Sequence, residues 1–509
     1  MIAILDFGSQ TAQLVARRLR DHHIYCKIFN LDEPETVTDE QPDGFILSGG
    51  PASVYDTGSP QIPDYVINSG KPILGICYGM QAMTHKLGGV VAASGRREYG
   101  SADIEVNGPN PILGGSQQVW MSHGDRIERV PPGFTPIAGS VNSPIAAMAD
   151  LQRNYFGLQF HPEVRHTVGG AEILRRFAVQ VCGVRTDWTS SSIAEQSIAA
   201  IREQVGKEGA IVAISGGVDS CVAAALAHRA VGEQLMAIFV DTGLLRKGEP
   251  SNVAETLRKH LNLELIVVDA SREFLEDLKG ITEPEEKRSR IGERFIRVFE
   301  RETKALGRPH FLIQGTIYPD VIESREPERN QAQRIKSHHN VGGLPEEMDF
   351  ELVEPLRTLF KDEVRRVGKE LGLPDELVYR QPFPGPGLAV RCVGEVTSER
   401  LKWLRNADAI FVSELESEGL INQQHAPIAQ AFAALLPVYS VGVMGDQRTY
   451  QECVALRAIT TEDYMTADWA RLPGDLLARV SRRIVNEVDG VNRVLYDVSS
   501  KPPATIEWE

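Results

Sequence analysis

Two series of short apolar runs, each run followed by an amphipathic segment, constrain the fold of this chain more than any other feature of its sequence. In the first series, which extends from residue 1 to about 180, the runs lie at Ile2–Leu5, Gly44–Leu47, Pro72–Ile76 and Tyr155–Phe160. The second series has runs at 210–214, 235–240, 263–268 and 310–313, with helical patterns such as 220–231 and 253–260 between them. This alternation is typical of parallel strands that are connected and covered by helices. We therefore predict two parallel-sheet α/β domains.

Two segments of unusual composition divide the chain. The polar stretch 185–193 has no long apolar period and is typical of a connector that leads into a helix, with Ser192 as the N-cap. Residues 381–387 hold three prolines and two glycines, which neither a helix interior nor a central strand tolerates. Beyond them, strand-like segments mixed with helix indicate a smaller α+β domain, with the strands at 438–443, 494–498 and 504–508. The predicted domains are 1–187, 188–384 and 385–509.

Length and charge exclude several classes of protein. At 509 residues the chain is longer than one hydrophobic core usually organises. The 54 Lys and Arg against 69 Asp and Glu give a net charge of −15, which repels a phosphate polyanion, so we expect no nucleic-acid partner. No apolar stretch approaches the roughly 20 residues of a membrane-spanning helix, and no basic region precedes the first apolar run, so we expect a cytoplasmic protein without a membrane partner. The six cysteines have no metal-ligand spacing and predict neither a zinc site nor a disulfide framework.

One segment of the second domain has the composition of a lid. Residues 323–345 are rich in charge, His, Asn and Gly and poor in large apolar side chains. The pair His338 and His339 resembles a metal site, but no third ligand is near in the sequence. We therefore expect a nucleotide-contacting or solvated lid there.

Cys77 has the surroundings of a nucleophile. The segment Gly75–Gly79 joins an apolar strand to a helical stretch, and small residues on both sides of Cys77 allow a sharp turn. Such a turn leaves the central side chain exposed at a helix N-terminus, where the helix dipole and free amides stabilise a thiolate. An isolated cysteine is more often a buried structural residue, but the two glycines and the strand–helix junction favour the nucleophile.

A base and an oxyanion site follow other strands of the first domain. His161 and Glu163 come directly after the strand that ends at Phe160, and residues two apart on an extended chain face the same way. Glu163 would then orient His161, and His161 would take the proton of Cys77. The turn Ser48–Pro51 also follows a strand and could aim backbone N–H groups at an oxyanion, although a plain tight turn would look the same.

Taken together, these motifs resemble those of the class I glutamine amidotransferases over about 180 residues. The resemblance implies a thioester formed on Cys77 from the side-chain amide of glutamine, release of ammonia, and hydrolysis to glutamate. It also implies that Gly50 and Tyr78 supply the oxyanion amides and that Ser122–Asp125 lies near the glutamine pocket.

A phosphate-binding loop begins the second domain. Ser215–Ser220 (Ser-Gly-Gly-Val-Asp-Ser) lies between a strand and a helix, where glycine backbone, hydroxyl groups and the helix N-terminus favour an anion. The loop lacks the Gly-Lys-Ser/Thr of Walker type, and Asp219 could hold Mg²⁺ bound to phosphate oxygens. A capped glycine turn without a ligand is the alternative.

The same six residues resemble the signature of the PP-loop ATP pyrophosphatase family. That resemblance implies that ATP is the co-substrate, that it is cleaved between its α and β phosphates, and that a substrate oxygen is adenylated. The implied ATP-binding residues are Ser215, Gly216, Gly217, Val218, Asp219, Ser220, Val240 and Lys361.

Four further segments, 334–345, 381–387, 442–446 and 501–509, resemble glutamine-dependent synthetases that aminate a purine nucleotide. The resemblance implies that xanthosine monophosphate (XMP) is adenylated at its C2 oxygen and converted to GMP, and that the C-terminal domain forms a homodimer. The implied XMP-binding residues are Arg288, Asp446, Arg448, Lys501 and Glu507. Arg448 and Lys501 carry suitable charge for a monophosphate. Ile506 and Trp508 are predicted to anchor a short terminal strand.

Two other classes fit parts of the sequence. PP-loop domains also activate carbonyl oxygens in tRNA bases, but such an enzyme predicts a basic surface and cysteines for sulfur relay. A glutamine or nucleotide sensor would need no intact nucleophile, whereas Cys77, His161 and Glu163 are all present.

Overall fold

The computed structural model describes residues 1–9, 11–108, 110–307, 309–324, 350–444, 446–461, 464 and 466–509. The chain divides into two compact units, Met1–Ser192 and Ile193–Glu509. Most of the predicted lid at 323–345, including His338 and His339, lies outside the described residues.

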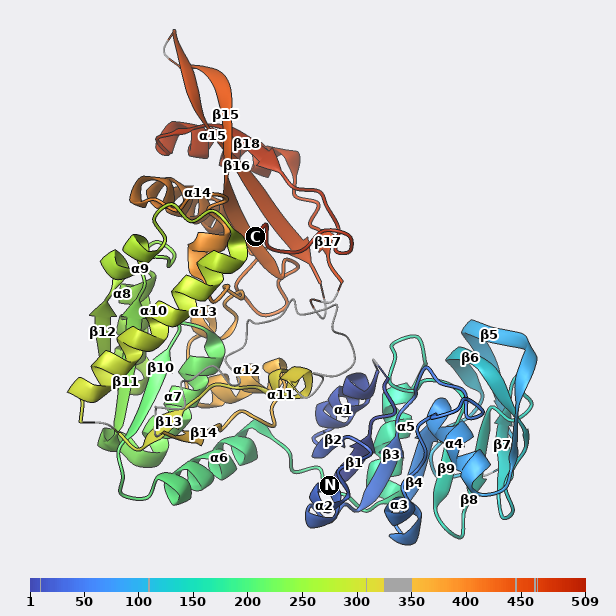
Figure 1. Cartoon of the computed structure of the whole chain (residues 1–509). Helices are drawn as coiled ribbons and strands as arrows, with labels where there is room; N and C mark the ends of the chain where they lie inside the picture. The colour runs from blue at the N-terminus through green and yellow to red at the C-terminus, as the bar shows by residue number, and fades with distance from the viewer. Residues whose placement is uncertain are drawn as a thin grey trace. The chain divides into compact units, whose positions relative to one another are not determined.

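The first unit is built on one mixed sheet. Its described strands have the order β2-β1-β3-β4-β9-β8-β7-β5-β6. The strands from β2 to β9 are parallel, which confirms the predicted parallel sheet, and those from β9 to β6 are antiparallel. Their bounds are β1 Ile2–Leu5, β2 Cys26–Phe29, β3 Gly44–Leu47, β4 Ile73–Ile76, β5 Val90–Val106, β6 Gln117–Arg129, β7 Thr135–Gly139, β8 Ala147–Asp150 and β9 Tyr155–Leu158. In Figure 1 the antiparallel strands lie on the side of this unit away from β1 and β2.

Each parallel strand of the first unit is followed by a helix. These helices are α1 (Ala12–Asp21), α2 (Pro34–Asp39), α3 (Asp64–Asn68), α4 (Tyr78–Lys86) and α5 (Gly170–Arg176), followed by a π-helical turn at Phe177–Val181. Helix α1 packs against α5, and α4 packs against β3, β4 and β9. The central strands β1, β3, β4 and β9 are buried along their whole length, as near-continuous apolar runs predict.

The second unit contains the second predicted parallel sheet, with the order β12-β11-β10-β13-β14. Its strands are β10 Ala210–Ile214, β11 Leu235–Asp241, β12 Leu265–Asp269, β13 Phe311–Ile313 and β14 Glu351–Val353. The helices around it are α6 Ser190–Val205, α7 Val218–Val231, α8 Glu249–Leu261, α9 Ser271–Asp277, α10 Pro284–Ala305, α11 Tyr318–Ser324, α12 Lys361–Glu370 and α13 Asp375–Val378. Helix α7 lies against β10, β11, β13 and α12.

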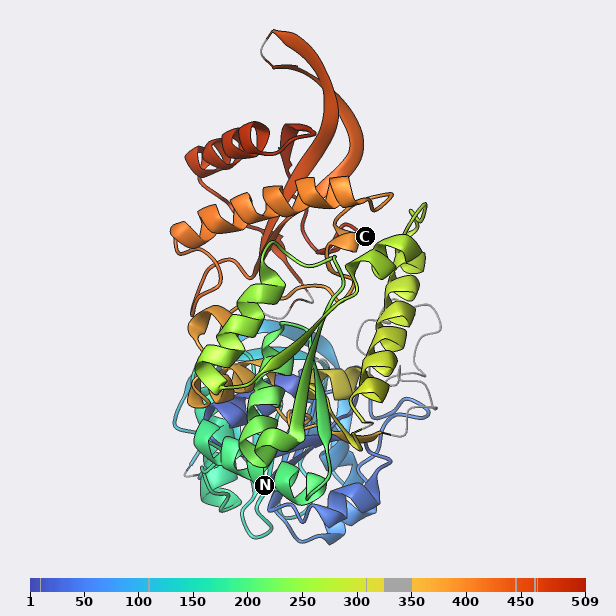
Figure 2. The same cartoon turned by 90° about the vertical axis from the view of Figure 1, so that its left-hand side faces the viewer.

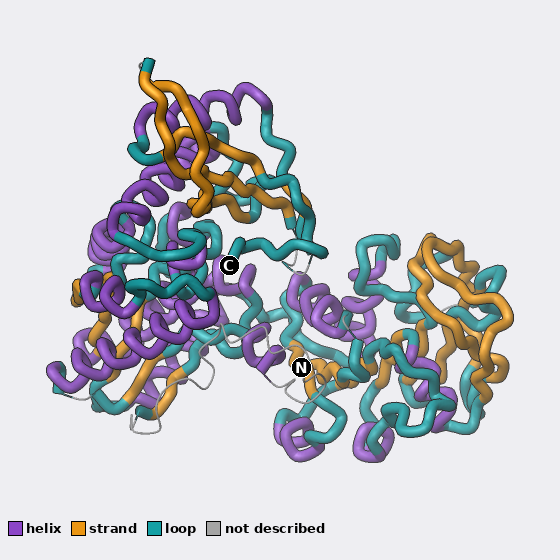
Figure 3. Tube along the Cα trace, turned by 45° about the horizontal axis from the view of Figure 1, so that its top comes forward, coloured by secondary structure: helices purple, strands orange, loops and turns teal. Residues whose placement is uncertain are grey.

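The predicted α+β region after residue 384 is present in the same unit. It contains α14 (Ser398–Ser417), α15 (Gly474–Glu487) and a sheet of β15 (Gln430–Met444), β16 (Gln447–Thr460), β17 (Asp468–Trp469) and β18 (Val491–Tyr496). The antiparallel strands β15 and β16 form a long hairpin that extends beyond the helices of this unit (Figures 1 and 2). The tube view shows these two strands side by side up to the turn (Figure 3).

One hydrophobic cluster spans both parts of the second unit. It includes Ile238 of β11 and Val298 of α10 together with Leu404 of α14 and Val454 of β16. The proline-rich loop 381–387 is part of this junction, because Gln381 Oε1 accepts from the amide of Ala431 in β15 at 2.8 Å, and the amide of Leu388, directly after the loop, donates to the carbonyl of Leu244 at 2.7 Å. The loop therefore joins the two parts, and the boundary at 384 stays a prediction.

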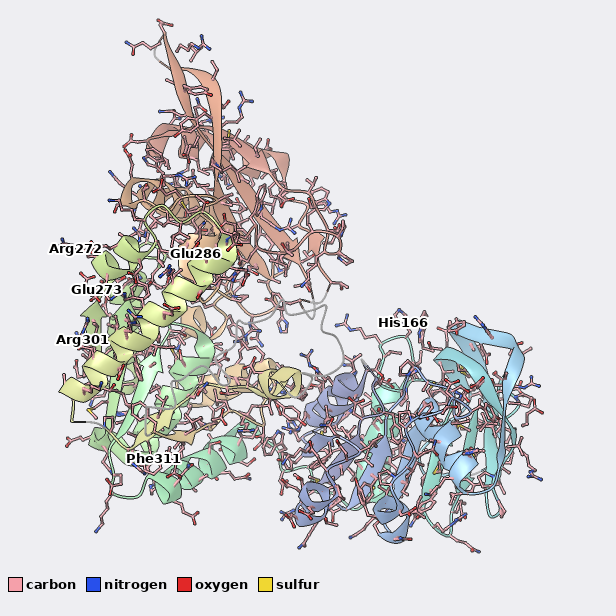
Figure 4. The ribbon with its side chains drawn as sticks, viewed as in Figure 1. His166, Arg272, Glu273, Glu286, Arg301 and Phe311 are labelled. Carbon is pink, nitrogen blue, oxygen red and sulfur yellow. The ribbon has the colours of Figure 1, made fainter. Side chains whose placement is uncertain are left out.

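Ion pairs hold α10 against α9. Arg301 contacts Glu273 at 3.0 Å, and Arg294 contacts both Glu273 and Asp277 at 3.2 and 2.5 Å. Figure 4 shows Arg301 on α10 and Glu273 on α9. These pairs fix a helix that carries two residues bound to the C-terminal tail, Lys287 and Arg288.

The C-terminal tail is not the strand that the sequence predicts at 504–508. It forms turns, and side chains replace a strand partner, because Arg457 donates to the carbonyl oxygens of Ser499, Thr505 and Ile506 at 3.1, 2.9 and 2.8 Å. Trp508 is 41% exposed and is no anchor. The anchors are acidic instead: Glu509 pairs with the fully buried Lys287 at 2.5 Å.

Helix α6, which follows the connector, begins three residues earlier than predicted. The amide of Ser192 donates to Thr189 Oγ1 at 3.2 Å, so Thr189 is the N-cap and Ser192 lies inside the first turn. Just before it, Trp188 packs on the first unit, with its ring 4.6 Å from the guanidinium of Arg20 and 4.5 Å from the ring of Tyr25.

Within the described part of the chain, no helix is both long and apolar enough to cross a membrane.

Gly79 should not tolerate a side chain. A Cβ there would lie 2.4 Å from the carbonyl oxygen of Leu47, and that oxygen belongs to a buried strand that cannot move aside. We expect Gly79→Ala to destabilise the first unit by roughly 2 kcal/mol, measured as earlier proteolysis of residues 1–192 in a urea series. Gly292→Ala is the matched control, because a Cβ at that position in α10 meets nothing within 4 Å. Equal urea profiles for the two variants would contradict the expectation.

Candidate active sites

Cys77 occupies a strained turn between β4 and α4. Its φ of 49° lies in the left-handed region, which non-glycine residues adopt rarely and mostly at functional sites. Its amide donates to the carbonyl of Leu158 in β9 at 2.7 Å, which fixes the turn against the neighbouring strand. The geometry is that of the predicted nucleophile elbow.

Glycine is required on both sides of this turn. A Cβ on Gly75 would lie 2.6 Å from the amide nitrogen of Met80, so strand and helix approach too closely for any side chain. The amide of Gly79 donates to the carbonyl of Ser48 at 3.1 Å. The turn after β3 is thereby fixed next to the turn after β4.

His161 and Glu163 form a buried pair beside Cys77. His161 Nδ1 and Glu163 Oε1 are 2.7 Å apart, and the two residues are 8% and 0% exposed. Since Nδ1 is bound to the carboxylate, the other ring nitrogen makes the hydrogen bond that links His161 to Cys77. The backbone carbonyl of Glu163 accepts from Arg18 Nε at 3.0 Å, which ties the pair to α1. Glu163 therefore contacts His161, and His161 contacts Cys77, as the sequence predicts.

The pKa of His161 is raised from 6.5 to about 10. Burial alone would lower the pKa, but the hydrogen bonds and charges of Cys77 and Glu163 outweigh it. His161 is therefore an imidazolium at neutral pH, positioned to give a proton to a leaving amine.

The loop after β3 lies against this pair. A Cβ built on Gly49 would be 3.3 Å from Cε1 of His161, and one on Gly50 would be 3.4 Å from Cγ of Tyr78. Gly50 and Tyr78, the two predicted oxyanion residues, are thus neighbours. Tyr78 is the first residue of α4, where a backbone N–H has no acceptor within its own helix.

The thiol is more enclosed than the sequence suggests. Cys77 is 6% exposed, because Gly49 covers one side and two polar groups lie on another. The carbonyl oxygen of Ser122 lies 3.6 Å from Sγ, and Gln159 Nε2 lies 3.8 Å from it. The expected proximity of Ser122–Asp125 to the site therefore agrees with the structure, whereas an exposed Cys77 was a wrong expectation.

The phosphate loop follows β10 at the carboxyl edge of the second sheet. Gly216 has a φ of 79°, and Gly217 precedes the first residue of α7, Val218. Ser220 Oγ accepts from the amide of Ser215 at 3.2 Å and lies 3.1 Å from Ser215 Oγ. Gly315, after β13, approaches the loop so closely that a Cβ would be 3.0 Å from the backbone of Asp219.

Asp219 and Lys361 form an ion pair within this loop region. Lys361 is the first residue of α12, which packs on α7. Among the described residues, the other carboxylate oxygen of Asp219 is buried and has no hydrogen-bond partner. That free oxygen fits Mg²⁺, which commonly takes one or two protein carboxylates together with substrate phosphates. No cluster of three or more His, Cys, Asp or Glu that could hold a metal occurs in the described ranges.

A second ion pair supports the loop and has no motif in the sequence. Arg380 contacts the buried Glu249 at 2.5 Å and donates to the carbonyl of Gly216 at 3.0 Å. The residues of this pair are far apart in the chain, so only the folded structure brings them together.

Val240 lies beside the phosphate loop. Ile214 pairs with Phe239 in the parallel register of β10 and β11, so Val240 is level with Ser215. Its side chain is 6% exposed. Any contact with a nucleotide would therefore come from its backbone.

Three of the predicted XMP residues belong to the region of the C-terminal tail. Arg288 Nη2 donates to the carbonyl of Glu509 at 2.7 Å, and Glu507 accepts from the buried Arg391 at 3.0 and 2.8 Å. Lys501 pairs with Ala467 through the backbone, and its Nζ donates to the carbonyl of Tyr464 at 2.7 Å.

The other two predicted XMP residues lie elsewhere in the chain. Asp446 and Arg448 are exposed at the turn of the β15–β16 hairpin. Arg457 contacts the tail, and it lies nine residue steps along β16 from Arg448, or about 30 Å at about 3.3 Å per step. One chain does not bring Arg448 and Glu507 to the same mononucleotide.

A buried cysteine–histidine–glutamate site and a glycine-lined phosphate loop in the same chain define a class of enzyme, a glutamine amidotransferase joined to an ATP-using synthetase. Residues 3–181 match the family described as glutamine amidotransferase class-I, and residues 193–290 match NAD synthase. Residues 414–508 match the GMP synthase C terminal domain.

Full-length relatives specify the family. A protein of Thermomicrobium roseum is 57% identical and covers 100% of this chain and 96% of its own length, and one of Vibrio vulnificus strain YJ016 is 53% identical and covers 100% and 98%. Both are named GMP synthase [glutamine-hydrolyzing]. A solved structure from Thermoplasma acidophilum, described as one subunit of a GMP synthase, is 31% identical, covers 36% of this chain and 93% of its own, and has a TM-score of 0.31. The chain belongs to the glutamine-hydrolysing GMP synthase family.

Glu163→Gln should weaken the charged pair at Cys77. Without the carboxylate, the pKa of His161 falls, less thiolate is paired with an imidazolium, and alkylation of Cys77 by iodoacetamide near neutral pH slows roughly tenfold. Mass spectrometry of the Cys77 peptide measures the rate.

The same substitution gives a pH-dependent stability difference. Because the pKa of His161 is raised on folding, its stabilisation is full below 6.5 and is lost as the pH rises through about 10. The difference in unfolding free energy between wild type and Glu163→Gln should therefore shrink over that window. A constant difference across it would contradict the assigned charge state.

Proposed function

We propose that the two sites divide the synthesis of GMP between them. The first hydrolyses glutamine and supplies ammonia, and the second uses ATP to activate XMP. The observation that carries this proposal is the presence, in one chain, of the buried His161–Glu163 pair beside Cys77, with Nδ1 and Oε1 2.7 Å apart, and of an Asp219 oxygen without a partner among the described residues of the phosphate-loop region.

At the first site, Cys77 Sγ attacks the side-chain carbonyl carbon of glutamine. The backbone amides of Gly50 and Tyr78 stabilise the oxyanion, and His161 protonates the departing ammonia, which leaves a thioester. Water then attacks the thioester while His161 accepts a proton, and glutamate is released. Glu163 holds His161 through Nδ1 so that the opposite ring nitrogen faces the sulfur.

At the second site, the C2 oxygen of XMP attacks the α phosphate of ATP, and pyrophosphate leaves. Ammonia then replaces the adenylated oxygen, which yields GMP and AMP. ATP would bind to the backbone at Val240 and to the residues of the phosphate loop, which are Ser215, Gly216, Gly217, Val218, Asp219 and Ser220. Lys361 would leave its ion pair with Asp219 and contact a phosphate oxygen of ATP instead. Bound at Asp219, Mg²⁺ would neutralise phosphate charge.

The C-terminal hairpin supports a homodimer. Apolar and aromatic side chains are exposed along it, including Val443 at 76% and Tyr450 at 67%. Exposed patches of this kind mark interfaces. In a symmetric dimer, Asp446 and Arg448 of one chain would complete the XMP site that Arg288, Lys501 and Glu507 form in the other. The boundaries 1–187, 188–384 and 385–509 and a cytoplasmic location remain predictions of the sequence.

Substitutions should separate the two half-reactions. Cys77→Ala abolishes synthesis driven by glutamine but spares synthesis driven by high ammonium at alkaline pH, because ammonia bypasses the first site. Asp219→Asn lowers the rate of GMP synthesis with either nitrogen source. Mass analysis of the products from XMP, ATP, Mg²⁺ and the nitrogen source provides the measurement. Formation of ADP and orthophosphate, in place of AMP and pyrophosphate, would contradict the adenylation scheme.

A mixture of two inactive chains should test the shared XMP site. Arg448→Ala and Lys501→Ala each damage every site of their own dimers. In a randomly mixed dimer population, half the dimers are mixed and each has one intact site, so about a quarter of wild-type activity returns. The measurement is ammonium-driven GMP formation after the two variants are unfolded and refolded together. If one chain formed the whole site, the mixture would stay as inactive as its components.

A further inference from the structure

We propose that Gln159 is a further catalytic residue of the glutaminase site, whose side-chain amide donates to Cys77 Sγ and stabilises the thiolate. The proposal rests on the proposed function of Cys77 as the nucleophile. Gln159 is fully buried, and its Nε2 lies 3.8 Å from the sulfur.

The orientation of the Gln159 amide follows from a chain of hydrogen bonds that begins at a backbone carbonyl. The carbonyl oxygen of Asp125 can only accept, and Gln81 lies 3.0 Å from it, so Gln81 presents its NH₂ group there. The same NH₂ group lies 3.4 Å from Gln159 Oε1. Gln159 therefore turns its own NH₂ group to the remaining neighbour, which is Cys77 Sγ.

A second buried group fixes the carbonyl of Asp125. His123 Nδ1 lies 2.9 Å from this oxygen and therefore carries the proton. The other ring nitrogen faces Glu98 Oε2 at 3.3 Å, and Glu98 accepts from Ser143 Oγ at 2.9 Å. His123, Glu98 and Ser143 are all less than a tenth exposed. The donor at Cys77 is thus held by a buried network and not by mobile side chains.

A donor at this position has a clear chemical effect. A thiolate is a charged acceptor, and a hydrogen bond to the charged form favours that form. The His161 imidazolium also places a positive charge beside this sulfur, but its proton is needed by the leaving ammonia. The Gln159 amide has no proton to lose, so it can stabilise sulfur anion through the whole cycle, including when the thioester is hydrolysed and the thiolate departs.

Alkylation of Cys77 tests the proposal without glutamine. Gln159→Met has similar length and no donor, and we expect it to slow iodoacetamide alkylation near neutral pH roughly tenfold. Gln152→Met is the matched control: Gln152 is exposed on a turn of the same unit, and its alkylation rate should equal that of wild type. Thermal unfolding checks that both variants fold.

Two further measurements separate the donor from other roles. In glutaminase assays, Gln159→Met should lower kcat and leave KM near the wild-type value, whereas a raised KM with unchanged kcat would assign Gln159 to glutamine binding and overturn the proposal. Gln81→Met should slow alkylation less than Gln159→Met, and the double variant no more than Gln159→Met alone, because Gln81 acts through Gln159.

An unchanged alkylation rate in Gln159→Met would overturn the proposal, whatever the glutaminase activity. If wild-type Cys77 alkylates rapidly but the protein releases no glutamate from glutamine, the proposed function fails while the donor role of Gln159 stands. The two failures are therefore distinguishable.

Discussion

The first site depends on the close approach of two backbones. Helix α4 approaches two strands so closely that a Cβ on Gly75 of β4 would meet the backbone of α4, and a Cβ on Gly79 of α4 would meet Leu47 of β3. This contact forces Cys77 into its positive φ, and the bond from Gly79 to Ser48 brings the loop of Gly49 and Gly50 to the same place. The proposed nucleophile and the proposed oxyanion loop are thus positioned by main chain, which is more rigid than side chains alone.

The second site follows the same architectural rule with different chemistry. In both units the functional loops lie at the carboxyl ends of parallel strands, where open α/β sheets bind ligands. At Cys77 the turn holds one enclosed thiol beside His161, whereas at Ser215–Ser220 it gathers backbone and hydroxyl groups into the loop proposed to bind phosphate. Each unit therefore uses one kind of fold for a separate half of the reaction.

Local patterns predicted most of this arrangement. Apolar runs located the central strands within a residue or two, and glycine spacing located both loops, because these features depend on neighbours in the chain. The tail at 504–508 was predicted as a strand and is not, since its partners are the buried Arg391 and Arg457, which no local pattern relates to it. Gln159 could have been predicted: it precedes His161 by two residues, as His161 precedes Glu163, so the same alternation turns it toward Cys77. The pair of Arg380 and Glu249 could not, because only tertiary structure joins them.

The ion pair of Lys361 and Asp219 has a consequence for selectivity among anions. A lysine whose charge is already neutralised attracts a simple anion from solution only weakly, because capturing it would leave a partly buried carboxylate uncompensated. A ligand that arrived with its own divalent cation would meet no such cost, since the cation proposed at Asp219 would compensate the carboxylate and leave Lys361 free to contact phosphate. The loop should therefore discriminate in favour of metal-chelated polyphosphates and against free phosphate or sulfate. Binding of the nucleotide to the loop should also weaken less with ionic strength than the charge of the nucleotide alone would suggest.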